Sequence, residues 1–230
     1  KLPSTNKKIK FRPYKTVHEK LLLMAVAQGS NERDMELALK QTVAYCVLDE
    51  KIDVDKLPVF DLMYIWIQAR ARSVSEEVEI SFLGNEDSDC EECKKPKTVK
   101  IKLNDIQVEK HKEHSLKIEL SNGVGLMMKY PTIEMNSEIN LVETNDQNKV
   151  LESVAKCIEY VYDKENTYMC VDQKPEEIIA WLDNLTPQHF GKILMFFYTM
   201  PKLSHRINMV CEQCGAKSFY NVEDIRSFFG

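Results

Sequence analysis

The sequence predicts an α+β fold in which helices pack around a small antiparallel β-sheet, and three observations carry this prediction. Apolar residues recur at helical spacing over much of residues 16–72 and again over 150–200. Between residues 77 and 131 the apolar period changes to two, which is typical of strands. Two Cys-x-x-Cys pairs lie between strand-like runs, so a metal-binding hairpin pair is expected to join the middle of the chain to its end.

The first part of the chain predicts one strand followed by three helices. Residues 7–14 alternate apolar and basic side chains up to a proline, which favours a short edge strand; its basic residues are Lys7, Lys8, Lys10 and Arg12. The helix expected from Thr16 is apolar on most sides, so it is predicted to be buried. Its stripe contains Val17, Leu21, Met24 and Gln28.

Two further helices are expected in this part. The break at 29–31 precedes a helix in which Met35, Leu39, Val43 and Cys46 recur at helical spacing. The next helix opens at Pro58 and is expected to bury Trp66.

Residues 77–131 predict two β-hairpins. In the runs 77–82 and 98–103 apolar residues alternate with polar ones, which are mainly acidic in the first run and basic in the second. Antiparallel pairing would therefore set Glu77 and Glu79 against Lys100 and Lys102. The second hairpin turns at Asn122-Gly123, which is a frequent two-residue hairpin turn. The four strands are expected to form one small sheet.

The last part of the chain predicts helices and a final hairpin. Residues 150–161 are read as one amphipathic helix containing Cys157, and Pro175 and Thr186-Pro187 open two more. The aromatic run 193–200 is expected in the core, the alternative being an exposed face in an assembly. Strand-like residues then bracket the second cysteine pair, and Asn221 can cap a last short helix ending at 228–229.

The four cysteines of the two Cys-x-x-Cys pairs are the candidate metal ligands: Cys90, Cys93, Cys211 and Cys214. Each pair supplies half of a tetrahedral shell, so the most economical interpretation is one shared structural Zn2+. Gly215 permits the tight turn after the second pair. The separation of the pairs exceeds that of ordinary zinc ribbons, which leaves two alternatives open. One pair could recruit His111, His114 or His205, or the cysteines could serve redox or disulfide chemistry.

The other cysteines and the composition limit the remaining possibilities. Cys46 and Cys157 fit core positions, and a buried thiol is the simplest interpretation of Cys170. Seven cysteines without a recognisable secretion signal favour a reducing compartment, with thiols and metal in place of disulfides. A net charge of −5 and a pI near 5.7 argue against nucleic acid or anionic membrane as partners, and no apolar run approaches 18 residues. The chain begins with Lys1 rather than Met, so residues ahead of it are expected.

A single α+β domain over 1–230 is predicted. Its possible subdivision is an N-terminal strand and helices (1–75), β-hairpins with the first cysteine pair (76–135), and a helical part with the second pair (136–230). No Gly-rich phosphate loop, Ser/His/Asp constellation or His-Glu-x-x-His pattern is present, so the chain is not expected to be an enzyme.

Three groups of residues carry a resemblance to a known family. They are Leu2-Pro-Ser-Thr-Asn-Lys-Lys-Ile-Lys-Phe-Arg-Pro with the helix Glu19-Lys-Leu-Leu-Leu-Met-Ala, Ile52-Asp-Val-Asp-Lys-Leu-Pro-Val-Phe-Asp61 with Arg70-Ala-Arg-Ser-Val74, and Lys129-Tyr-Pro-Thr-Ile-Glu-Met135. In these stretches the chain resembles baseplate hub proteins of T4-type tailed bacteriophages. Members of that family favour glycine where this chain has Asn6, a mild departure because asparagine tolerates the same turn conformation.

The resemblance implies a structural or assembly role in the hub of a contractile tail, with other hub and tail proteins as partners. It implies location in the host cytoplasm during assembly and in the virion if the protein stays in the particle. The alternatives are a transient assembly chaperone that is absent from the finished virion, and a zinc ribbon that binds nucleic acid. The acidic residues around Cys90 and Cys93 disfavour the second alternative.

Overall fold

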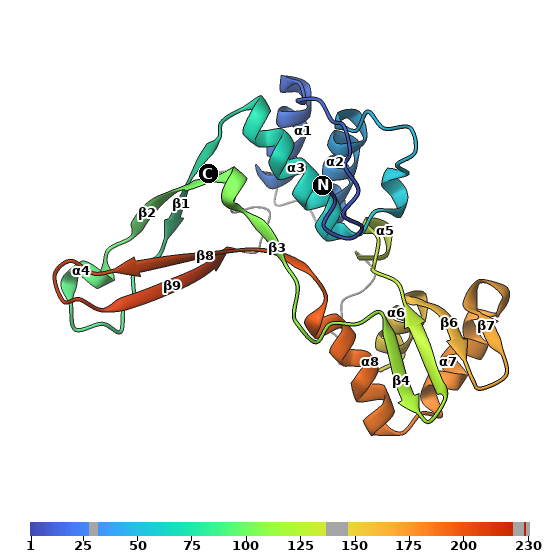
Figure 1. Ribbon diagram of the computed structural model, residues 1–230. Coiled ribbons are helices and arrows are strands. Elements are labelled where there is room, and N and C mark those ends of the chain that lie inside the picture. The colour runs from blue at the N-terminus through green and yellow to red at the C-terminus, as the bar shows by residue number, and fades with distance from the viewer. Residues whose placement is uncertain (28–31, 137–146, 223–227, 229–230) are drawn as a thin grey trace. The chain divides into compact units, whose positions relative to one another are not determined.

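The computed structural model (Figure 1) describes residues 1–27, 32–136, 147–222 and 228, and it confirms the α+β class. The chain divides into two compact units. The first unit comprises Lys1–Val54, Phe60–Glu109 and Lys202–Gly230, and the second comprises Asp55–Val59 and Lys110–Pro201. Because each unit combines segments distant in sequence, neither coincides with one of the three consecutive parts predicted above. The assignment of the whole chain to a single domain stays a prediction.

Three helices form the helical part of the first unit: α1 (Thr16–Ala27), α2 (Glu32–Cys46) and α3 (Val59–Ser73), whose first residue alone belongs to the second unit. Trp66, Val43 and Cys46 are buried among them, as the helical spacing predicts. The prediction that α1 is buried is wrong. Val17 is 63% exposed and Met24 57%, because α1 packs through Leu22 and no other described part of its unit covers the stripe.

The edge strand predicted for residues 7–14 is reduced to a single bridge between Phe11 and Val47. Arg12 N donates to Cys46 O at 2.9 Å and Leu48 N to Lys10 O at 2.9 Å. The pairing stops there because α2 ends at Cys46, so only a short extended piece is available as a partner. Asn6 has a φ of 58°, in the left-handed region where asparagine can replace glycine.

A buried polar network fastens the N-terminal residues to α3. Tyr14 N donates to Ser73 Oγ at 2.9 Å, and Tyr14 OH donates to Glu19 Oε2 at 2.6 Å. Glu19 also forms a short ion pair with the buried Arg70. Burial and the neighbouring Glu19 carboxylate raise the pKa of Tyr14, so its hydroxyl stays protonated and donates.

The first unit also contains two small sheets. Strands β1 (Glu77–Phe82) and β2 (Lys97–Lys102) pair antiparallel in the predicted register, with Glu77 opposite Lys102 and Glu79 opposite Lys100. Glu79 and Lys100 form an ion pair of 3.2 Å. The second sheet has the order β3-β8-β9 and contains β3 (Gln107–Glu109), β8 (Lys202–Val210) and β9 (Lys217–Val222). The helix predicted after Asn221 lies outside the described residues except for Phe228, which is buried.

The second unit is a four-stranded antiparallel sheet of order β4-β5-β6-β7 packed with helices. Its strands are β4 (Lys117–Ser121), β5 (Val124–Met128), β6 (Ile158–Tyr162) and β7 (Thr167–Met169). Its helices are α5 (Ile133–Asn136), α6 (Gln147–Lys156), α7 (Pro175–Asp183) and α8 (Pro187–Thr199). Short 3-10 turns occupy Val54–Lys56 (η1), Leu103–Asp105 (η2) and Cys170–Asp172 (η3). Gly123 has a φ of 80° in the predicted β4–β5 turn.

Two predictions about these strands are wrong. The two hairpins do not share one sheet, because β1 and β2 pair only with each other whereas β4 and β5 join β6 and β7. The helix predicted over 150–161 ends at Lys156, and residues 158–162 form β6, since β5 offers a pairing edge to this β-branched and aromatic run.

The aromatic run of α8 divides between the core and the surface. Ile193 and Phe196 are buried in the core of the second unit, whereas Met195 and Tyr198 are exposed. Thr186 caps the helix as predicted, because its hydroxyl oxygen accepts from His189 N at 3.2 Å.

Candidate metal centre

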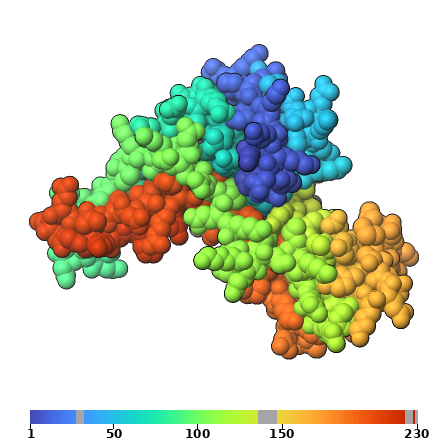
Figure 2. Space-filling model, viewed as in Figure 1, coloured from blue at the N-terminus to red at the C-terminus, as the bar shows by residue number. Residues whose placement is uncertain are grey.

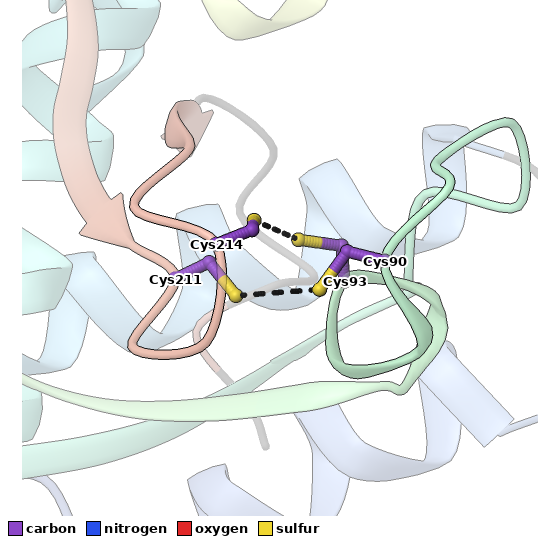
Figure 3. Close-up of side chains that lie close together, drawn as sticks. All are labelled: Cys90, Cys93, Cys211 and Cys214. Atoms are coloured by element: carbon purple, nitrogen blue, oxygen red, sulfur yellow. Dashed lines mark hydrogen bonds between the residues drawn. The ribbon is translucent and has the colours of Figure 1, made fainter.

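The four predicted cysteine ligands meet in the first unit, where two hairpin tips face each other (Figure 3). In the β1–β2 loop, Cys90 precedes the short helix α4 (Glu91–Lys94) and Cys93 lies within it, whereas Cys211 and Cys214 lie in the β8–β9 turn. The sulfur of Cys90 is 3.9 Å from that of Cys211, and the sulfur of Cys93 is 3.6 Å from that of Cys214. All four sulfurs lie within 4.8 Å of one another.

These separations fit a tetrahedral thiolate site. With a metal–sulfur bond of about 2.3 Å, the edges of an ideal tetrahedron of sulfurs are about 3.8 Å long. The sulfurs are too far apart for disulfide bonds, whose S–S length is about 2.0 Å, and all seven cysteines are free thiols. The chain therefore places four soft ligands where one metal ion can bind them all.

The backbone of the first pair is shaped by its own loop. Ser88 Oγ accepts from Cys90 N at 3.2 Å, and Cys93 N donates to Cys90 O at 3.0 Å. Asn85 N closes the loop by donating to Cys93 O at 2.8 Å. Gly84 is required beside this bond, since a Cβ there would lie 1.8 Å from the carbonyl oxygen of Lys94.

The second pair forms a tight turn whose amides point toward sulfur. Gly215 has a φ of 70°, as its position after the second cysteine pair predicts, and its N–H donates to Cys211 O at 2.8 Å. The backbone N–H groups of Cys214 and Gln213 point at the Cys211 sulfur and lower the pKa of that thiol to about 6. A thiolate is thus favoured at Cys211 even before a cation binds.

The pKa of the neighbouring Cys93 thiol is shifted in the opposite direction. Hydrogen bonds with Cys211 and Cys214 raise the pKa of Cys93 to about 12, because a second negative sulfur beside the first is disfavoured. Four thiolates therefore need a cation at their centre. Metal binding would release the remaining protons, as it does in thiolate metal sites generally.

The histidine alternatives receive no support from the geometry. His111, His114 and His205 do not belong to the group of metal-ligating side chains formed by the described residues. His114 lies in the second unit, where Nδ1 is 3.0 Å from Thr199 Oγ1 and Nε2 is 3.0 Å from Tyr130 OH. Both of its ring nitrogens are therefore already engaged.

The remaining cysteines lie outside the metal centre. Cys46 and Cys157 are fully buried, as predicted for core residues, and burial raises their pKa values to about 11 and about 12. Cys170 is half-buried in η3, and burial raises its pKa as well.

One supporting contact was not predicted from the sequence. Tyr220 of β9 stacks on Phe82 of β1 with ring centroids 4.3 Å apart, and its hydroxyl donates to Leu83 O at 3.2 Å. This contact holds the two hairpins together near the two cysteine pairs. Alternation along β9 could have placed Tyr220 on a face, but no local signal identifies its partner.

The acidic residues around the first pair are partly neutralised by lysines on α4 and after it. Lys94 pairs with Glu91 at 2.7 Å and Lys95 with Glu92 at 2.8 Å. These exposed pairs contribute little to stability, but they reduce the negative charge beside the thiolates.

Comparison with known proteins gives one family. The family described as T4 bacteriophage base plate protein matches residues 1–230, the whole chain. No curated protein and no solved structure matches the chain. In the described part of the chain, every helix is too short or too polar to cross a membrane.

Proposed function

The chain belongs to the T4 bacteriophage base plate protein family, and on that basis we propose that it builds the baseplate hub of a contractile tail by binding other baseplate proteins. The match over the whole chain is the observation that carries this proposal. A structural or assembly role follows from the family, and the hub is the part of the baseplate that the sequence resemblance favours.

We propose that the metal is Zn2+ and that its role is structural. Four thiolates at tetrahedral separations are the ligand set that zinc takes in closed sites. Such a site leaves no position for water or substrate, so the ion would hold the two hairpin tips together without taking part in a reaction.

The protein is proposed to act by binding and not by turnover. No catalytic cluster accompanies the closed metal site in the sequence, and family membership supports contacts with other baseplate proteins. The proposed locations are the host cytoplasm during assembly and the tail baseplate afterwards. The competing version of this function is a chaperone-like factor that leaves before the virion is complete.

A graded rescue experiment tests the binding role. A lysate of phage defective only in this protein is supplemented with increasing amounts of purified protein, and infectious particles are counted. We expect rescue to saturate when the protein approaches the number of assembling hubs. Full rescue at far lower amounts would contradict a stoichiometric role.

Mass spectrometry then separates the structural role from the chaperone role. The protein is quantified in infected-cell assembly complexes and in purified virions. Presence in both identifies a part of the particle, and presence only in the cell identifies a transient factor.

A further inference from the structure

The second unit contains an open cavity of about 290 Å3 between the β6–β7 edge of its sheet and α7. Its walls are largely apolar, and the lining residues include Tyr168, Trp181, Val124, Val161 and Ile178. Ligand pockets usually measure about 300–1,000 Å3. This cavity is therefore suited to one or two side chains of a partner and is too small for a large cofactor.

The ring of Tyr162 lies on the other face of the sheet from Val161 and Tyr168, because neighbouring residues of a strand point to opposite faces. The ring of Tyr162 lies over Gly125 of β5, where an added Cβ would be 2.4 Å from the tyrosine hydroxyl oxygen. The ammonium group of Lys117 approaches the same ring, 4.8 Å from its centroid. The Tyr162 ring is therefore held away from the cavity and does not fill it.

The aromatic wall at Tyr168 is fixed by the turn between β6 and β7. Asp163 Oδ1 accepts from the N–H groups of Glu165 and Asn166 at 2.8 and 2.7 Å, and Asp163 Oδ2 accepts from Tyr168 OH at 3.1 Å. These bonds hold the Tyr168 ring at the cavity. A cavity with fixed walls avoids much of the ordering entropy that binding otherwise costs.

A strand edge that pairs with no other described strand borders the cavity. β7 is the last strand of its sheet, and the cross-strand row Leu126–Val161–Tyr168 ends on it. An additional strand would continue this row and place a side chain beside Tyr168, on the cavity side. Antiparallel alternation, starting from the Asp163 N–H bond to Asn166 O, directs the backbone groups of Thr167 and Met169 outward.

The surface around this edge is both apolar and acidic. Tyr168 is 46% exposed and Val171 85%, and the segment around β7, gold in Figure 2, lies on the surface shown. Asp163 and Glu177 line the cavity, and among the described residues no lysine, arginine or histidine does. Residues 159–183 contain seven Asp or Glu and two Lys. A partner with basic side chains would therefore be attracted here.

We propose that β7 and this cavity together form a docking site for an extended, basic segment of another baseplate protein. The segment adds a strand to the free edge of β7 and inserts a large apolar side chain beside Tyr168. Its lysine or arginine side chains lie near Glu177. This assignment rests on the proposed function, since it names the chemistry of a partner that the function requires.

Photo-crosslinking in infected cells tests the identity of the occupant. p-Benzoyl-L-phenylalanine is introduced into the full chain at Gln173, which is exposed and lines the cavity, and at Gln188 of α8 as a control outside it. We expect Gln173 to capture a peptide of another baseplate protein that contains Lys or Arg and a large apolar residue. The Gln188 position should not capture that peptide.

Two substitutions test the contacts. Met169→Pro removes one outward N–H and suits the local backbone, because Met169 has a φ of −71° and the preceding strand residue is extended. Loss of one edge hydrogen bond should raise the protein concentration for half-maximal rescue about three- to tenfold. Glu177→Lys should raise it by a similar factor at low salt, whereas Glu152→Lys, an exposed charge reversal in α6 outside both the cavity and the acidic stretch, should not.

The outcomes separate this site from the proposed function. If wild-type protein rescues stoichiometrically but both substitutions rescue equally well, the docking site is refuted and the function stands. Crosslinks at Gln173 only to copies of the same chain, to lipid or to nucleic acid would also refute the site. If the wild-type protein itself fails to rescue, the proposed function is refuted, and the docking site that rests on it is refuted with it.

Discussion

Replacing one cysteine from each Cys-x-x-Cys pair should show that the two pairs form one shared metal site. The perturbations are Cys90→Ser, Cys214→Ser and the double variant, compared in a buffer with a competing chelator. Because the four sulfurs lie within 4.8 Å of one another, losing either ligand should release the metal. The double variant should then be little less stable than either single variant, since the shared interaction can be lost only once.

The expected magnitude follows from the length of chain that the metal closes. The paired cysteines are 121 residues apart in sequence. Closing a loop of that length lowers the conformational entropy of the unfolded chain, which raises the free energy of unfolding by up to about 5 kcal/mol. The stacking of Phe82 on Tyr220 also brings the hairpins together in the folded protein, but it does not restrict the unfolded chain. Each single variant should therefore lose about 2–5 kcal/mol of unfolding free energy in this chain-entropy treatment.

Chemical denaturation, with metal content measured on the same samples, provides the assay. Wild-type protein should carry about one zinc per chain, and Co2+ substitution should give the absorption of a tetrahedral thiolate site. Cys170→Ser, a half-buried cysteine outside the site, serves as the control and should retain the metal. A double variant that loses the sum of the two single losses would refute a shared site. A stoichiometry near two would show that each pair binds its own ion.

Three further predictions concern the interior. Glu19→Ala should lower the unfolding free energy by about 3–5 kcal/mol in a denaturant titration, because it removes the carboxylate that neutralises the buried Arg70. Burial, and then the charges of Lys110 and His111, hold the pKa of His114 below 6.5, so stability should fall as pH drops from 6.5 toward the folded pKa. His114→Gln should weaken this pH dependence of unfolding most, and His111→Gln, which removes only a smaller contribution, should weaken it less. Cys157→Ala should reduce stability but leave zinc content unchanged by elemental analysis.

The meeting of the four cysteines was predictable because its signal is chemical and local. Each Cys-x-x-Cys pair specifies half of a tetrahedral shell without reference to the rest of the fold, so two pairs imply one another even when 121 residues separate them. Gly215, which allows the tight turn after the second cysteine pair, was identified for the same reason. Gly84 was not, because the need for glycine there comes from the Lys94 carbonyl across the loop.

The misassigned elements depend on pairing partners that the local sequence does not name. The first hairpin was predicted in its correct register because opposite charges alternate on its two strands. In contrast, residues 158–161 fit both a helical stripe and a strand, and only the open edge of β5 decides between them. For α1 the apolar pattern was recognised but its consequence was wrong, since Val17 and Met24 have no cover within the described part of their unit.

The stretches that carry the family resemblance contact one another inside the fold, which explains what kind of information they hold. Ser4 donates through its N–H to Asp61 at 3.0 Å, Glu19 pairs with Arg70, and Pro58 bridges to Thr132. Each of these contacts joins two of the recognised stretches, and each builds a scaffold. The β7 edge and its cavity lie outside those stretches. Resemblance of this kind therefore identifies the shared framework, whereas the choice of partner must be read from exposed edges, cavities and charge, where the framework leaves the sequence free to vary.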